Sequence, residues 1–111
     1  MEPVEINAGA WYLRALRDDE RVTDVPALTD LGIGDPAGFV VSAARGWADE
    51  TRFTWAVCEP TTGEMLSLIV VDATPAVLRA QARSGSESTL DDAVPAVTRF
   101  VEGALGIALP S

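Results

Sequence analysis

The stretch Arg52–Asp72, RFTWAVCEPTTGEMLSLIVVD, decides the fold of this chain. Over residues 52–58, apolar β-branched and aromatic side chains alternate with other residues, which predicts a strand. Residues 59–64 are polar and include a proline and a glycine, which predicts a turn. Residues 65–71 are an almost unbroken apolar run, typical of a strand buried on both faces. The stretch therefore predicts an antiparallel hairpin in a central sheet that is flanked by helices.

Length and composition favour one folded domain over residues 1–111. Of the 111 residues, 48% are hydrophobic, which is enough for a packed core. No apolar run reaches the ~18–20 residues of a membrane span. The acidic start, MEPVEINAG, lacks the basic and apolar regions of a secretory signal. We therefore expect a cytoplasmic protein without membrane association.

The charged residues exclude several classes of function. The net charge is −9, and all cationic side chains are arginine, because the chain has neither lysine nor histidine. An acidic chain repels phosphate backbones, so we expect no nucleic-acid partner, and an anionic cofactor would need a local cluster of arginines. Without histidine, a Ser-His-Asp triad, a Cys-His pair and the usual zinc sites are excluded. We expect no metal site.

Four further side chains have a structural and a functional interpretation. The single cysteine, Cys58, cannot form an internal disulfide, and its place in a predicted strand favours a buried, inert thiol over a reactive one. The tryptophans Trp11, Trp47 and Trp55 either line a pocket or fill the core, and a core role is the default for such side chains.

The residues before the hairpin predict a strand and two helices. Residues 1–9 read as an extended or loose lead-in, and Trp11–Leu16 as a first strand. Thr23 and a proline three residues later predict the start of a helix that ends near residue 31. Asp35-Pro36 repeats this start signal for a second helix through residue 47, which glycines at positions 38 and 46 weaken.

The residues after the hairpin begin with an ambiguous segment. Residues 75–83 read either as a short helix or as a third strand beside the hairpin. Ser84–Ser88 is a loop, and residues 90–105 carry the i, i+3, i+4, i+7 apolar stripe of an amphipathic helix. Pro95 requires that this helix start near residue 91 or 92, or else kink.

In this order the segments resemble the GCN5-related N-acetyltransferases (GNAT), in particular the branch that acetylates ribosomal-protein N-termini and related amines. The matching stretches are WYLRALRDDE, DVPALTDL, the hairpin and LDDAVPAVTRFVEGALGI, over most of residues 10–107. The resemblance implies an α+β fold with a central, largely antiparallel sheet flanked by helices. Relative to the family, the chain lacks the C-terminal strands.

The resemblance also implies where a cofactor would bind. In the family, the pyrophosphate of acetyl-coenzyme A lies on backbone N–H groups where a glycine-rich loop opens the long helix. Here that position falls on Ser84, Gly85, Ser86, Glu87, Ser88 and Thr89. Arg79 and Arg83 are the nearby cations.

This sequence departs from the family motif, Arg/Gln-x-x-Gly-x-Gly/Ala. Gly85 replaces the first residue, Ser88 the central glycine and Leu90 the last small residue. Glu87, inside the loop, and two aspartates just beyond it repel a pyrophosphate.

Catalytic groups are also missing or unassigned. The family's tyrosine lies in strands that the resemblance does not cover, and the only tyrosine is Tyr12. Glu59 and Asp72 are candidate bases by position, although both also read as solvated carboxylates at strand ends. The catalytic residues are therefore unknown.

Three hypotheses follow. The first is a GNAT-like domain that is non-catalytic, has no cofactor, and acts as a binding or accessory subunit, either as a homo-oligomer or with a heterologous protein partner. The alternative is an active acetyl-CoA-dependent N-acyltransferase, or another small-molecule enzyme, whose pocket a second chain completes. The third is an unrelated α+β interaction module. A strand at residues 75–83 favours the first two, and a helix there favours the third.

Overall fold

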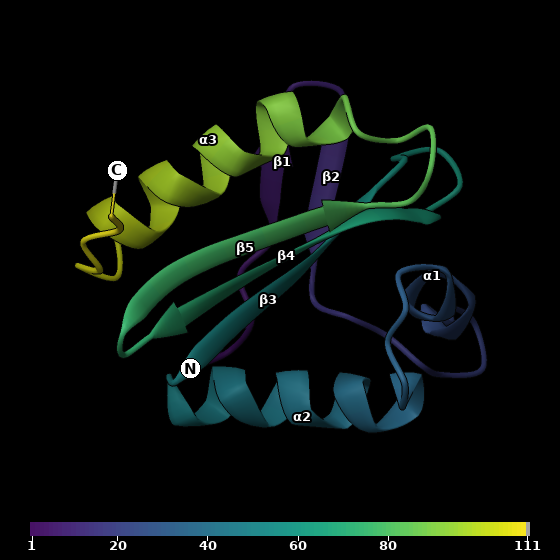
Figure 1. The fold of residues 1–111 in the computed structure, drawn as a ribbon, viewed down its shortest axis with the longest axis horizontal. Coiled ribbons are helices and arrows are strands. Elements are labelled where there is room, and N and C mark those ends of the chain that lie inside the picture. Colours follow the sequence, from purple (N-terminus) through teal and green to yellow (C-terminus); the bar gives the residue numbers. More distant parts are fainter. Residues whose placement is uncertain (111) are drawn as a thin grey trace.

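The computed structural model describes residues 1–110, which fold into one antiparallel sheet with helices on both faces (Figure 1). The five strands lie side by side in chain order, β1-β2-β3-β4-β5. The helices α1 and α2 cover one face of the sheet and α3 covers the other. The elements are β1 Ile6–Ala8, β2 Trp11–Arg14, α1 Val25–Asp30, α2 Pro36–Asp49, β3 Arg52–Cys58, β4 Met65–Ala73, β5 Ala76–Ala82 and α3 Thr89–Gly103.

The predicted hairpin is confirmed as β3 and β4. The two strands pair antiparallel from Arg52 opposite Asp72 to Cys58 opposite Met65, with an irregularity between Val57 and Cys58. Side chains of β4 alternate between the two faces. One set packs with α3 and the other with α1 and α2, so β4 is the doubly buried strand that its apolar run predicts.

Two tryptophans are confirmed as core residues. Trp47 and Trp55 are 1% and 0% exposed, and their rings meet edge to face with centroids 5.1 Å apart. Phe53 and Phe100 extend this aromatic cluster by edge contacts at 5.2 Å and 5.9 Å. Each buried indole N–H donates to a backbone carbonyl, as burial of a polar group requires. The third tryptophan, Trp11, is half-buried at the edge of the same core.

Part of the lead-in over residues 1–9, Ile6–Ala8, is a strand. These residues form β1, which pairs antiparallel with β2, with Ile6 opposite Leu13. A strand of three residues is too short to show a period of two in the sequence. It forms because β2 offers it a row of backbone donors and acceptors.

The ambiguous segment is a strand. β5 lies along most of β4, with Ala76 opposite Ala73 and Ala82 opposite Ser67. Its alanines, leucine and glutamine are compatible with a helix, but β4 would otherwise leave its whole outer edge unpaired, and this tertiary demand outweighs propensity. The structure therefore favours the two GNAT-like hypotheses.

The long amphipathic helix is confirmed, but its start is earlier than expected. α3 begins at Thr89, two or three residues before the start near residue 91 or 92 that Pro95 predicted, and ends at Gly103. Pro95 lies inside the helix on an exposed position. Within the described residues, no helix is long and apolar enough to cross a membrane.

Candidate functional site

The predicted phosphate loop, Ser84–Thr89, connects β5 to the N-terminus of α3 (Figure 1). The Gly85 N–H donates to Oε1 of Glu87 at 3.0 Å, so a carboxylate of the loop occupies a donor that an anion would use. The Ser86 N–H donates to the Arg83 carbonyl at 2.9 Å. Gly85 has a φ of +88°, which suits glycine and lets the chain turn here. The loop is held in shape by its own atoms.

The first turn of α3 is closed in the same way. The N–H groups of Thr89, Leu90 and Asp91 each donate to the carbonyl three residues earlier, at 3.1 to 3.2 Å. The Thr89 hydroxyl donates to the Ser86 carbonyl at 2.7 Å and lies 2.5 Å from Oγ of buried Ser67. Unsatisfied N–H groups make a helix N-terminus an anion site. Here most of those groups have partners, and Asp91 and Glu87 add negative charge.

Arg83, at the end of β5, is neutralised by two carboxylates. Its guanidinium lies 2.6 Å from Oδ2 of Asp30 and 3.4 Å from Oε2 of Glu64. A further N–H donates to the Met65 carbonyl at 3.1 Å. The group around Arg83 thus carries a net charge of about −1, which disfavours a phosphate.

Neither candidate base is placed to act at the loop. Glu59 is half-buried in the turn between β3 and β4, and hydrogen bonds from the backbone of Thr61 and Thr62 lower its pKa. Asp72 forms ion pairs with Arg52 at 2.7 Å and with Arg79 at 2.9 Å. Ser67 of β4 contacts Thr89 of the loop, and Asp72 lies five residues further along the same strand. At the rise per residue of a β-strand, this separation is about 17 Å.

Tyr12 and Cys58 show no sign of activation. The Tyr12 hydroxyl donates to Oε1 of Glu5 at 2.5 Å, and this bond is the largest cause of its raised pKa. Cys58 is fully buried, and desolvation raises its pKa to about 11, so the thiol stays protonated at neutral pH. Its buried position confirms the inert interpretation.

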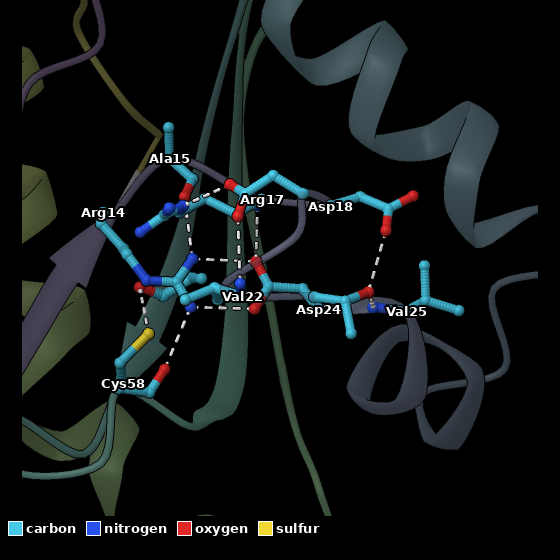
Figure 2. Close-up of polar contacts among 12 residues, drawn as sticks. Arg14, Ala15, Arg17, Asp18, Val22, Asp24, Val25 and Cys58 are labelled. Atoms are coloured by element: carbon cyan, nitrogen blue, oxygen red, sulfur yellow. Dashed lines mark hydrogen bonds and ion pairs between the residues drawn. The ribbon is translucent and has the colours of Figure 1, made fainter.

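The sequence analysis missed a buried ion pair. Figure 2 shows Arg14 of β2 facing Asp24, which precedes α1; two guanidinium nitrogens lie 2.8 and 2.9 Å from the two carboxylate oxygens. Arg14 also donates to the Gly63 carbonyl at 3.0 Å, and the Arg17 N–H donates to Asp24 at 2.7 Å. With side chains 8% and 2% exposed, the pair ties β2, α1 and the hairpin turn together. The polar residues were visible in the sequence, but their pairing was not.

A pocket of about 370 Å³ lies between β5, β4 and the start of α2. Its apolar walls are Ile33, Phe39, Leu68 and Val70, and its rim carries Arg52, Arg79 and Gln81. Such a volume is in the range of small-molecule sites. Within residues 1–110, no group of acidic or cysteine side chains is arranged to hold a metal ion.

Comparison with known proteins establishes the class of fold. The five-stranded antiparallel sheet with α1 and α2 on one face and α3 on the other is a GNAT-like α+β fold. No family model and no curated protein matches the sequence.

A solved structure gives the particular likeness. It is described as a "putative ribosomal-protein-serine acetyltransferase from Vibrio cholerae". The TM-score is 0.74 at 14% sequence identity, over 98% of this chain and 74% of that chain. At this identity the likeness establishes the fold, while the expected phosphate loop stays a prediction.

Proposed function

We propose that this chain is a non-catalytic GNAT-like domain that acts as a binding or accessory subunit. The observation that carries the proposal is the closed loop at the start of α3. There the Glu87 carboxylate holds the Gly85 N–H, and the first turn of the helix bonds to its own loop carbonyls. A pyrophosphate would have to displace a carboxylate from the Gly85 N–H and compete with loop carbonyls for the N–H groups of the first turn.

The strand that leads into the loop and the candidate base Asp72 are also poorly suited to amine acetylation. A general base must lie within hydrogen-bond reach of the amine. β5, the strand that enters the loop, has Arg79 as its charged residue and no carboxylate. Asp72 is engaged by two guanidinium groups, which would also repel a protonated amine.

A second chain has a place to attach at β5. This strand pairs with β4 on one side, and no other strand of residues 1–110 pairs with its outer edge. Its residues are half-buried or exposed. A shallow recess of about 500 Å³ beside it is lined by Val77, Leu78, Val94, Leu109 and other residues of α3 and the C-terminal segment. A strand from another copy or another protein would satisfy the free backbone groups and cover these apolar side chains.

The test is calorimetric titration of the purified chain with acetyl-coenzyme A, with the mass in solution measured in parallel. We expect no heat of binding at millimolar cofactor. Micromolar binding would overturn the proposal and support the alternative of an acyltransferase completed by a second chain. A dimer mass supports self-association, and a monomer mass indicates a heterologous partner.

A pair of matched variants tests whether the Glu87 carboxylate excludes acetyl-coenzyme A from the loop. Glu87→Gln removes the charge that holds the Gly85 N–H, and Glu20→Gln removes one charge from an exposed position elsewhere. If the loop carboxylate excludes the cofactor, only Glu87→Gln gains binding, by about tenfold for one charge-assisted hydrogen bond.

A further inference from the structure

One carboxylate is shared by two arginines at the rim of the pocket between β5 and α2. Nε of Arg52 donates to Oδ1 of Asp72 at 2.7 Å, and Nη2 of Arg79 lies 2.9 Å from Oδ2. The three residues come from three adjacent strands: Arg52 is opposite Asp72 in the sheet, and Arg79 is opposite Val70, two residues from Asp72 on the same face. The sheet register therefore creates the cluster.

The cluster carries one uncompensated positive charge in a protein of net charge −9. Two guanidinium groups face one carboxylate, and the adjoining recess adds Arg45 and Asp49, which balance each other. A guanidinium has five N–H donors. Within residues 1–110, Arg52 and Arg79 donate to no acceptor other than Asp72, so most of their donors are open to a ligand.

The guanidinium groups are accessible, and the pocket beside them is apolar. The side chains of Arg52 and Arg79 are 40% and 58% exposed, whereas Asp72 is 18% exposed, so a ligand meets the cations first. Leu68 and Val70 form a buried floor, and Phe39 adds a half-buried wall. An apolar cavity of this size with a few convergent polar groups is the usual form of a small-molecule site.

We propose that this pocket binds a small monoanion with an apolar body, such as a short-chain carboxylate, with its head on Arg52 and Arg79 and its tail on Leu68, Val70 and Phe39. The carboxylate replaces water on the free N–H donors, and a planar guanidinium suits it geometrically. A protonated amine, the acceptor expected for an acetyltransferase, is repelled. The inference deepens the proposed binding function by naming a ligand class.

The test uses hexanoate as the probe and ¹H–¹⁵N NMR of the labelled full chain as the measurement. Hexan-1-ol has the same tail without the charge, and hexylamine has the opposite charge. We expect hexanoate to shift the resonances of Phe39, Val70, Arg79 and Gln81 with a Kd of about 1 mM, reasonable for a ligand of this size. Hexan-1-ol should bind about tenfold more weakly and hexylamine still more weakly.

Three variants separate a charge effect from a loss of structure. Arg79→Gln should weaken hexanoate binding about tenfold, while Arg99→Gln, which removes the same charge from an exposed position on α3, should leave it unchanged. Asp72→Asn should strengthen hexanoate binding, because it removes the carboxylate that competes with the ligand for the guanidinium groups of Arg52 and Arg79. A merely structural role of the cluster would instead weaken binding in both Arg79→Gln and Asp72→Asn.

Either of two results would overturn the assignment. One is equal affinity for hexanoate and hexan-1-ol, which indicates a purely apolar pocket. The other is that hexanoate shifts no pocket resonance, or shifts only those of Ser84–Thr89. The proposed function is tested at the loop with acetyl-coenzyme A, so the two tests fail independently.

Discussion

The two arginines of the β5 region, Arg79 and Arg83, lie four residues apart and have opposite surroundings. Arg83 faces two carboxylates, Asp30 and Glu64, and its charge is more than neutralised. Arg79 shares one carboxylate, Asp72, with a second arginine, so positive charge is left over. Whether an arginine is available to an anion therefore depends on the acids that the fold brings to it. The balance of charge therefore supports the pocket beside Arg79, rather than the loop beside Arg83, as the site we propose for an anion.

Arg14 is an arginine in a third environment, because its ion pair with Asp24 is buried. Removing this acid should lower the stability of the fold more than removing any of the acids beside Arg79 or Arg83. Asp24→Asn leaves a buried guanidinium without its counter-charge, and we expect a loss of about 3–5 kcal/mol in the free energy of unfolding, measured in urea. Asp49→Asn, at an exposed position, should change it by less than about 0.5 kcal/mol.

If Asp24→Asn does not fold, a double variant still gives a result. Arg14→Met with Asp24→Leu removes both charges, and it should recover much of the lost stability because no charge remains buried. Equal instability of the double variant and Asp24→Asn would show that the packing of the two side chains, and not the unpaired charge, matters.

Gly46→Ala tests the close packing of α2 against β3 at Arg52. A Cβ at Gly46 would lie 2.7 Å from the Arg52 carbonyl oxygen, so α2 must move away from β3. We expect a net loss of about 1–3 kcal/mol by thermal or urea unfolding, even though alanine favours a helix. Gly103→Ala, in α3 with open space around it, should be neutral or stabilising. A stable Gly46→Ala protein would show that the helix and the strand are not in tight contact.

Neutralising the acids around Arg83 should make this arginine available to an anion, as Arg79 is. The double variant Asp30→Asn/Glu64→Gln should gain affinity for inorganic pyrophosphate by roughly tenfold or more, measured by calorimetry at low salt. The double variant Glu2→Gln/Glu102→Gln makes the same change of net charge at exposed positions away from both arginines and controls for it. Equal gains in both would mean that overall charge, and not local balance, sets anion binding.

The smallest effect concerns stability. Arg83→Gln should cost about 1 kcal/mol in the free energy of unfolding, because its side chain is 25% exposed and bonds two acids and a carbonyl. Arg79→Gln, with a side chain 58% exposed, should cost less than about 0.5 kcal/mol. A larger cost at Arg79 would mean that it serves the fold, which would weaken its assignment to a ligand.

Much of the fold was predictable because its signals are local. The alternation over Arg52–Cys58, the apolar run of β4 and the stripe of α3 each follow from short-range periodicity. The segment Ala76–Ala82 was not decided by its own residues, since the unpaired edge of β4 made it a strand. β1 was missed because three residues are too few to show a period.

The candidate sites were predictable to different degrees. The position of Ser84–Thr89 before a helix was predictable from the apolar stripe that follows it, and so were the acids Glu87 and Asp91. The capture of the Gly85 N–H by Glu87 was not, because a loop conformation depends on backbone angles that side-chain patterns do not report. The pocket was not foreseen either, because its walls come from four separate elements.

The sequence by itself determined the order and type of most elements, the amphipathic helix, and the absence of histidine and lysine chemistry. These follow from composition and from interactions within a few residues. The tertiary structure decided which arginines keep a positive charge that the surrounding acids do not fully compensate. Arg52 meets Asp72 across 20 positions of the chain, and Arg83 meets Asp30 across 53. Coulombic energy depends on distance in space, and only the folded chain brings the two charges of each pair within 3 Å of each other.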